Sequence, residues 1–385
     1  MTDPTDPLGF ETRAIHAGQE PEATTGAVVV PLFQTSTFAQ DGVGRPRNGW
    51  EYSRSGNPTR AALETALADL EEGAAGLAMP SGLAATDTLL RATCRPGDHV
   101  VIPHDAYGGT FRLIARVMEE WGLAWTAVDL SDLDAVRSAV ERPTRLVWCE
   151  TPTNPMLHVS DIAALATIAH DAGALLAVDN TFASPYLQRP LALGADVVVH
   201  STTKYLGGHS DVVGGALVAA DAAVGERLAY HQNAMGTVAG PFDAWLVSRS
   251  LRTLAVRMER HCDNAEAVVE LLTGHDAVGT VLYPGLATHP GHDVAAQQMR
   301  RFGGMVSFRA VGGRAAAVAI CEATRLFTLA ESLGGVESLI EHPTTMTHAS
   351  VSGSTLEVPD DVVRLSVGIE TTADLLADLR QALGG

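Results

Sequence analysis

The central part of the chain alternates short hydrophobic runs with longer stretches of helical periodicity. The hydrophobic runs include 100–102, 146–148, 175–178 and 195–199, and the helical stretches include 60–72 and 162–172. Short apolar runs that alternate with helices are typical of a parallel sheet covered by helices. We therefore predict a mostly parallel α/β domain over residues 57–240.

The two flanking parts show different patterns. Residues 1–56 carry frequent Pro, Gly and Asn with little periodicity, which predicts an extended arm that contacts a neighbouring subunit. Pro241 opens a helical pattern that continues to about Gly274, and we expect one long linking helix there. A smaller α/β domain would follow and contain the segments 304–308, 315–321 and 362–367. Residues 241–385 thus form the linking helix and the C-terminal domain.

Composition and charge narrow the class of protein. With 385 residues and 46% hydrophobic content, the chain can bury a large core, and its length suits two or three packed domains. The formal net charge of -19 argues against nucleic acid or an anionic membrane as a partner, because a polyanion would be repelled. A small anionic substrate needs only a local group of arginines and remains compatible with this charge.

Targeting, redox and metal signals are weak. Residues 1–7 contain no basic residue followed by an apolar stretch, and 18 consecutive apolar residues occur nowhere, so we expect a cytoplasmic protein. The four cysteines lie far apart and form no CxxC pair, which suits a reducing compartment. His289 and His292 flank a Pro-Gly turn, and we expect no metal there.

One lysine follows a predicted strand at a place where it could do chemistry. Lys204 lies in the segment His-Ser-Thr-Thr-Lys-Tyr, directly after the run 195–199. A pyridoxal phosphate enzyme needs a lysine held rigidly at a strand end, with hydroxyls and amides nearby for the phosphate. The alternative is a solvated surface lysine, which is the usual environment of this residue type.

A carboxylate at the end of the preceding strand supports the same chemistry. Asp179 follows the run 175–178, where a buried carboxylate is unfavourable without a partner. A protonated pyridinium nitrogen would be such a partner and would keep the cofactor ring cationic. The alternative is a helix cap or an Asx turn within Asp-Asn-Thr. With both strand ends present, a pyridoxal phosphate site is the better interpretation.

Several further segments form a pattern that resembles one enzyme family. They lie, in order, at 12–16, 52–59, 81–85, 107–110, 150–155, 179–182, 332–335 and 364–368. Together they resemble the Cys/Met-metabolism family of pyridoxal phosphate enzymes, which includes cystathionine gamma-synthase, cystathionine gamma-lyase, methionine gamma-lyase and cystathionine beta-lyase. The resemblance implies an aspartate-aminotransferase-like fold of type I. A nucleotide-binding α/β protein is disfavoured, because neither a GxGxxG opening a helix nor a GxxxxGK[ST] loop is present.

Two segments are expected to hold the cofactor phosphate. Ser81, Gly82 and Leu83 lie at a turn before a good helix former, so they present free amides and the positive end of a helix dipole to an anion. Ser201 and Thr203 add hydroxyls. The alternatives are an ordinary helix cap for Ser81 and turn hydrogen bonds for the other two residues.

The family resemblance adds roles to other residues. It implies that Tyr107 stacks on the cofactor ring and transfers protons, and that Asn154 contacts cofactor and substrate. It also implies that Tyr52 and Arg54 cross from a neighbouring subunit to the phosphate. Such a site lies at a dimer interface, and the family arrangement is a homotetramer built as a dimer of dimers.

The substrate side of the site determines which reaction is expected. The resemblance implies that Arg364 binds the substrate's α-carboxylate through its planar fork, with Ser332 as a neighbouring contact. Arg364 interrupts a hydrophobic run, where a charge is unfavourable without a partner. The alternative to carboxylate binding is that Arg364 faces outward from an edge strand. Glu51 and Glu331 could hold a distal ammonium, and Arg112 could hold a distal carboxylate.

Three positions separate the family's reactions. Gly109 stands where methionine gamma-lyases resemble one another in carrying cysteine, which disfavours that activity. Glu51 and Ser55 stand where many gamma-synthases resemble one another in carrying aspartate and arginine. We therefore expect a gamma-lyase that converts L-cystathionine to L-cysteine, 2-oxobutanoate and ammonia. The alternative is a gamma-synthase that uses an O-acylated homoserine and L-cysteine, or an enzyme with both activities.

Overall fold

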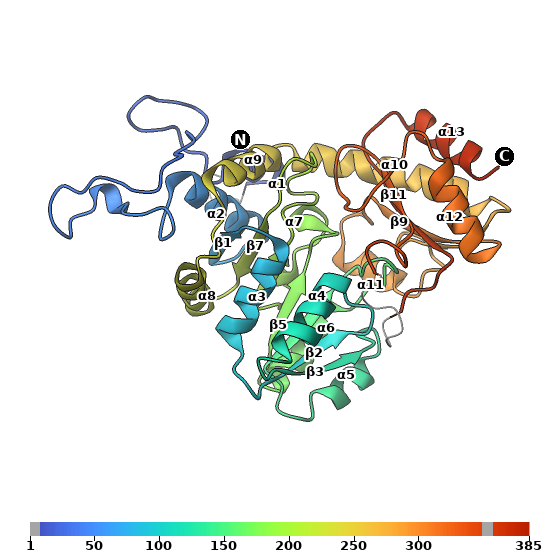
Figure 1. Cartoon of the computed structure of the whole chain (residues 1–385), viewed down its shortest axis with the longest axis horizontal. Helices are drawn as coiled ribbons and strands as arrows, with labels where there is room; N and C mark the ends of the chain where they lie inside the picture. The colour runs from blue at the N-terminus through green and yellow to red at the C-terminus, as the bar shows by residue number, and fades with distance from the viewer. Residues whose placement is uncertain (1–7, 349–356, 385) are drawn as a thin grey trace.

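A seven-stranded sheet forms the centre of the larger lobe in the computed structural model, which describes residues 8–348 and 357–384 (Figure 1). Residues 1–7, part of the basis for expecting a cytoplasmic protein, lie outside it. The strand order is β1-β7-β6-β5-β4-β2-β3. The strands are β1 (Ala75–Met79), β2 (His99–Pro103), β3 (Ala124–Val128), β4 (Leu146–Glu150), β5 (Leu175–Asp179), β6 (Val197–His200) and β7 (Gly215–Ala219). Neighbours from β3 to β6 pair in parallel, and β7 runs antiparallel to both of its neighbours, so the mostly parallel sheet is confirmed.

Helices bury both faces of this sheet, which explains why its strands are continuous hydrophobic runs. On β6, Val197 and Val199 pack into a cluster with α3, whereas Val198 packs on the opposite face with α2. The helical segments are α2 (Pro58–Glu71), α3 (Gly82–Thr93), α4 (Gly108–Arg112), the π-helical η2 (Leu113–Met118), α5 (Leu133–Ala139), α6 (Ile162–Asp171), α7 (Ser184–Leu187), the 3-10 segment η3 (Pro190–Leu193) and α8 (Ala222–Met235). Asn57 starts α2 by accepting hydrogen bonds from the amides of Thr59 and Arg60.

The C-terminal lobe contains a five-stranded sheet in the order β10-β11-β12-β9-β8. Its strands are β8 (Val278–Leu282), β9 (Met305–Ala310), β10 (Thr328–Leu329), β11 (Leu339–Glu341) and β12 (Val362–Ser366). Its helices are α11 (His292–Gln298), α12 (Gly313–Ala323) and α13 (Thr372–Ala382). Both α/β lobes occur as predicted. The domain boundaries at 57 and 241 stay a prediction.

The linking helix is interrupted, and the prediction of one continuous helix is wrong. The segment forms α9 (Pro241–Leu251) and α10 (Leu254–Thr273) instead. At the break, the carbonyl of Ser250 accepts hydrogen bonds from the side chains of Thr253 (3.1 Å) and Arg257 (3.0 Å). Side chains therefore satisfy this carbonyl at the chain turn, a contact that hydrophobic periodicity alone does not reveal.

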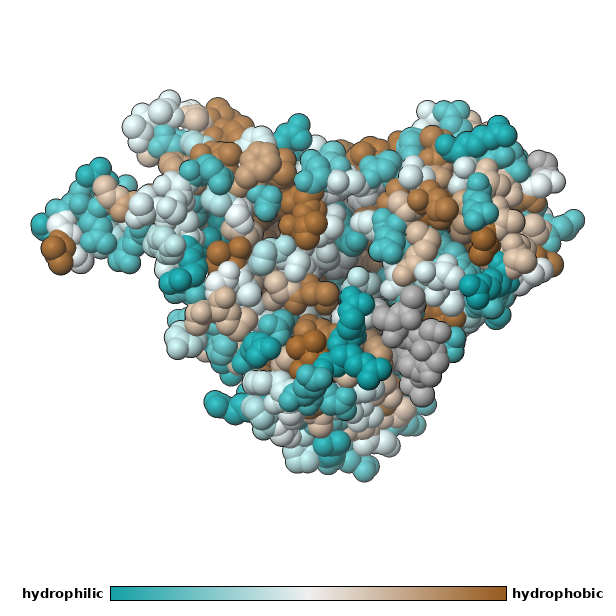
Figure 2. All heavy atoms as spheres, in the orientation of Figure 1, coloured by the Kyte–Doolittle hydropathy of each residue, from teal (hydrophilic) through white to brown (hydrophobic). Residues whose placement is uncertain are grey.

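The N-terminal arm is only partly extended. Residues Phe10–His16 form α1, and Arg13 of this helix makes ion pairs with Asp69 (3.3 Å) and Glu72 (3.1 Å) of the body. The remainder of the arm up to residue 57 is irregular apart from the short η1 (Arg47–Gly49) and reaches away from the sheet (Figure 1). Its exposed apolar side chains include Val28, Val29, Leu32, Val43 and Tyr52. Figure 2 shows hydrophobic groups on the surface at that side of the molecule.

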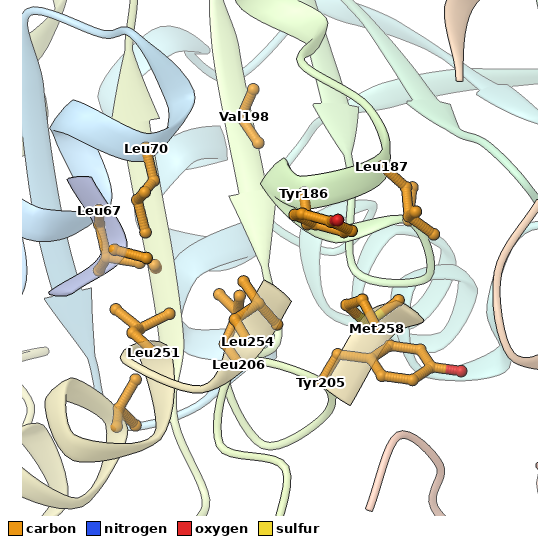
Figure 3. Close-up of a cluster of buried hydrophobic side chains, with 14 of the residues drawn as sticks. Leu67, Leu70, Tyr186, Leu187, Val198, Tyr205, Leu206, Leu251, Leu254 and Met258 are labelled. Carbon is orange, nitrogen blue, oxygen red and sulfur yellow. The ribbon is translucent and has the colours of Figure 1, made fainter. Parts of the chain in front are cut away.

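A buried cluster holds the segment after β6 in place. Tyr205 and Leu206 pack with Leu254 and Met258 of α10 and with Tyr186 of α7 (Figure 3). Tyr205 is fully buried, so the backbone next to Lys204 is fixed by the core. Within the described chain, no helix combines the length and hydrophobicity that a membrane crossing needs.

Candidate active site

The carboxyl ends of the central strands line a cavity of about 340 Å³. Glu150 ends β4, Asp179 ends β5 beside it, and Lys204 lies four residues after the end of β6. Ligands of open parallel sheets bind beyond these strand ends. The predicted site residues that line the cavity are Ser81, Gly82, Leu83, Tyr107, Asn154, Asp179, Ser201, Thr203, Lys204, Glu331, Ser332 and Arg364.

Lys204 lies between the two lobes. Its Nζ donates a hydrogen bond of 2.7 Å to the hydroxyl of Ser332. Burial lowers the pKa of this lysine to about 8, and the positive charge of Arg364 acts in the same direction. A substantial fraction of the amine is therefore neutral near physiological pH, which a nucleophilic lysine requires.

The surroundings of Asp179 disfavour the charged form of its carboxyl group. Its Oδ1 accepts a hydrogen bond of 3.0 Å from the amide of Thr181, so the Asx turn considered as an alternative is present. Burial raises its pKa, while the Thr181 hydrogen bonds act in the opposite direction. Glu150 is paired with Asp179 in the register of β4 and β5. Burial is the main cause that raises the pKa of Glu150 to about 8, and the charge of Asp179 is the second cause. A cationic partner in the cavity would stabilise these two neighbouring carboxylates.

The start of α3 faces the segment after β6. Ser81 caps this helix by accepting a hydrogen bond of 3.0 Å from the amide of Ala84, as its alternative role predicts. Gly82 lies so close to Ser201 that a Cβ atom there would be 3.0 Å from the serine Cβ. Thr203 exchanges hydrogen bonds with the backbone of Gly214, the turn contact considered for it. The first amides of α3 nevertheless remain without intrahelical partners, which suits an anion.

Tyr107 is positioned by a hydrogen bond that fixes its backbone. Its amide donates to Glu150 Oε2 at 2.8 Å, and Trp148 Nε1 donates to the other oxygen of this glutamate at 3.1 Å. The ring contributes to the cavity wall and lies over Gly109, where a Cβ atom would be 2.4 Å from Tyr107 Cε1. The absence of a side chain at Gly109 therefore determines where this ring can lie.

Arg364 is buried at the centre of the smaller sheet. Its strand, β12, lies between β11 and β9, so the alternative of an exposed edge position is wrong. Its Nη1 contacts Glu341 Oε1 at 2.8 Å and donates to Asn154 Oδ1 at 2.9 Å. Its Nη2 donates to the carbonyl of Ser332 at 2.7 Å, and its Nε has no hydrogen-bond partner among the described residues.

Four predicted site residues are not among those that line the cavity of their own chain. Glu51, Tyr52, Arg54 and Arg112 are exposed and do not line it. Arg54 instead lies over the Tyr52 ring at 5.5 Å and donates a hydrogen bond of 3.3 Å to Asn233. Within one chain, the arm residues and the cavity are therefore separate.

Comparison with known proteins identifies the family. The family model described as Cys/Met metabolism PLP-dependent enzyme matches residues 11–384. The chain belongs to this family. It is 64% identical to the cystathionine gamma-synthase of Mycobacterium tuberculosis over 98% of this chain and 97% of the relative. It is 50% identical to the cystathionine beta-lyase of Lactococcus lactis over 97% of this chain and 98% of the relative. The crystal structure of metB from Corynebacterium glutamicum matches with a TM-score of 0.97 and 56% identity, covering 98% of both chains.

These comparisons confirm a pyridoxal phosphate enzyme with the type I fold. The cavity fits the cofactor of this family, because an amine, a helix N-terminus and a half-buried carboxylate that a cation would stabilise line the same space. The match covers nearly the whole chain, as the sequence motifs predicted. The similarity to a cystathionine gamma-synthase favours the synthase alternative over the expected gamma-lyase.

Sequence reasoning missed two acidic residues and one strong signal. Glu150 begins the family-like segment 150–155, but no role was assigned to it from the sequence. An acid at the end of a buried strand is as unusual at this position as at Asp179. Glu341, the ion-pair partner of Arg364, likewise ends a short strand after the apolar pair Leu339 and Ile340. The missed signal is that Lys204 is the only lysine among the 26 lysine and arginine residues of the chain.

Proposed function

We propose that this enzyme is a cystathionine gamma-synthase, which replaces the acyloxy group of an O-acylated L-homoserine by the sulfur of L-cysteine. The observation that carries the proposal is the 64% identity, over 98% of the chain, to a relative of that name. A relative named cystathionine beta-lyase shares 50%. The bond from the γ-carbon to oxygen breaks, a bond to sulfur forms, and the thiol proton balances the departing carboxylate.

The cofactor would be held by residues of the large lobe. Pyridoxal phosphate, when bound, supplies an electron sink that weakens the bonds at the substrate's α-carbon. The amides at the start of α3, together with Ser201 and Thr203, would bind the phosphate. Asp179 would hold the proton on the ring nitrogen, and the ring charge would in turn lower the cost of burying this carboxylate.

The substrate's α-carboxylate would bind to Arg364. Nη1 and part of Nη2 are engaged by protein acceptors, which fix the plane of the guanidinium. Nε has no hydrogen-bond partner among the described residues, and an arginine fork suits a carboxylate. Glu331, at the cavity wall, would attract the ammonium group at the other end of cystathionine.

Two residues would move protons. Lys204, with a pKa of about 8, would accept a proton from the substrate's α-carbon and return one during the later steps. Tyr107 would stack on the ring and transfer a proton near the leaving group. Its anchoring to Glu150 through the backbone leaves the phenol free for that role.

The site would be completed by a second subunit. Tyr52 and Arg54 lie outside the cavity of their own chain, and the arm that carries them exposes apolar side chains. An interface would bury these groups, and an arginine fork suits a phosphate. We therefore propose a homodimer with shared sites, assembled as a tetramer of two such dimers in the cytoplasm.

Cystathionine gamma-lyase is the second candidate. Cystathionine is the product of the synthase and the substrate of the lyase, so the same contacts at Glu331, Ser332 and Arg364 would serve both reactions. Glu51 and Ser55, which suggested the lyase, lie on the exposed arm. Both residues would thus act only after assembly.

A paired assay tests the proposal. One sample receives O-succinyl- or O-acetyl-L-homoserine with L-cysteine, and formation of cystathionine is measured. A second sample receives cystathionine, and 2-oxobutanoate or pyruvate is measured to distinguish γ-cleavage from β-cleavage. Faster formation than cleavage supports the synthase. Rapid release of 2-oxobutanoate without formation of cystathionine would replace it by the lyase.

A further inference from the structure

Two imidazoles and a carboxylate gather just outside the cofactor cavity. His104 and Asp105 directly follow β2, and His158 lies in the loop between β4 and α6. One possible ligand atom from each of the three residues lies within 4.8 Å of the other two. Among residues 8–348 and 357–384, no other set of three or more His, Cys, Asp or Glu side chains meets this condition. His289 and His292, which the sequence brought into consideration, are not part of it.

Their geometry is close to what a tetrahedral metal ion requires. In a zinc site with bonds of about 2.0–2.1 Å, neighbouring ligand atoms are roughly 3.4 Å apart. Here His158 Nδ1 and Asp105 Oδ2 are 2.9 Å apart, and the imidazoles of His104 and His158 are stacked with centroids 5.7 Å apart. The three ligand atoms lie within 4.8 Å of one another, so side-chain movements of roughly 1 Å would bring them around one ion.

The surroundings of these three residues favour a cation. The Asp105 carboxylate accepts a hydrogen bond of 2.5 Å from the hydroxyl of Thr153, an outer contact of the kind that orients metal ligands. His104 Nδ1 is buried and has no hydrogen-bond partner among the described residues.

We propose that His104, Asp105 and His158 form a binding site for one divalent transition-metal ion, with Zn²⁺ as the favoured occupant. Two imidazoles and one carboxylate suit Zn²⁺ better than Mg²⁺ or Ca²⁺, which prefer oxygen ligands. The side chain of His158 is 41% exposed, which provides a path for the ion and a position for a water as fourth ligand.

The site would link two segments of the active site. Asp105 lies two residues before Tyr107, and Thr153, its hydrogen-bond partner, is adjacent to Asn154. An ion held at this place would tie the start of α4 to the loop after β4. The ion itself would lie outside the cavity wall and is independent of the reaction that the enzyme catalyses.

Metal titration of the cofactor-loaded enzyme tests this inference. After treatment with a chelator, the protein is titrated with Zn²⁺ in competition with a chromophoric chelator. We expect one tight site per chain, and His104→Gln and His158→Gln should each weaken it at least about tenfold. His170→Gln is the matched control, because His170 also pairs with an aspartate, Asp196 at 3.0 Å, but has no place in the three-residue group.

The outcomes separate a built site from adventitious binding. Circular dichroism and the visible band of the cofactor confirm that each variant is folded. Loss of the tight site in both variants, with an unchanged control, supports the proposal. Zn²⁺ binding that is no tighter in the native enzyme than in His104→Gln overturns it and indicates an adventitious ion only.

Discussion

Lys204 Nζ and Ser332 Oγ are 2.7 Å apart although 128 residues separate them in the sequence. The hydrogen bond joins the end of the large sheet to a loop of the smaller lobe. Ser332 has a φ of 93°, a conformation that is uncommon for residues other than glycine. The loop therefore places its hydroxyl at the amine at the cost of backbone strain, which concentrates at functional sites.

Replacement of Lys204 tests the central catalytic assignment. Lys204→Ala should abolish turnover while the fold remains intact, because it removes the amine but no core volume. Circular dichroism checks the fold and the paired assay measures turnover. Ser332→Ala is the comparison, since it removes only the partner hydroxyl and should retain measurable activity. More than a few per cent of native activity in Lys204→Ala would reject this lysine.

The lowered pKa of Lys204 predicts a pH dependence for cofactor uptake. Only the neutral amine can attack the cofactor aldehyde, and burial places the folded-state pKa at about 8, below the ordinary value for lysine. The rate of reconstitution of cofactor-free protein should therefore rise with pH and level off above pH 8. Below pH 8 it should fall about tenfold per unit. A rate that still rises steeply from pH 9 to 10 would mean an ordinary lysine pKa.

Asp179 can be separated from a simple cap by comparison with Asp161. Asp179→Ala should lower activity by orders of magnitude and weaken cofactor binding, because the ring nitrogen loses its anionic partner. Asp161 caps α6 through the amide of Ala164 outside the cavity, so Asp161→Ala should cost about 1 kcal/mol of stability and little activity. Thermal melts and cofactor dissociation constants distinguish the two. Equal, mild defects would reduce Asp179 to a cap.

Gly109 controls the Tyr107 ring. A cysteine at this position would bring Cβ within 2.4 Å of Tyr107 Cε1, so the ring must move. Displacement of a positioned group by about 1 Å can cost roughly 10²-fold in rate, and we expect a loss of that order in kcat for Gly109→Cys. Gly274→Cys is the control, because no atom lies within 4 Å of its Cβ position. Native kcat in both variants would show that the ring position is unimportant.

Mixing two inactive proteins tests the shared site. If Arg54 serves the neighbouring subunit, a dimer of Arg54→Ala with Lys204→Ala contains one site with both defects and one with neither. Random equimolar exchange should restore about a quarter of the native sites. Mass measurement in solution checks the assembly state. No recovery after verified exchange, together with a monomeric mass, would mean that the arm acts within its own chain.

The catalytic strand ends were predictable because a parallel sheet brings its carboxyl ends together. Lys204 and Asp179 follow continuous hydrophobic runs, and covered sheets require such runs. The interruption of the linking helix was not predictable from the hydrophobic pattern. The side chains of Thr253 and Arg257 donate hydrogen bonds to the Ser250 carbonyl at the break, and these contacts leave the hydrophobic pattern unchanged.

The partners of individual side chains were less predictable. Arg364 required a buried partner, but Glu341 becomes that partner only through the antiparallel register of β11 and β12. Arguments for the lyase relied on Glu51 and Ser55, which lie on the arm, away from the cavity.

The confinement of the only side-chain amine to the cavity makes this protein suited to direct counting of competent sites. Apart from the α-amino group, an amine-selective reagent finds one target per chain, at Lys204. A small aldehyde trapped by reduction should label cofactor-free chains there, and bound cofactor should block the label. Moles of label per mole of chain then give the fraction of sites that lack cofactor. Turnover numbers can therefore be expressed per cofactor-loaded site instead of per chain.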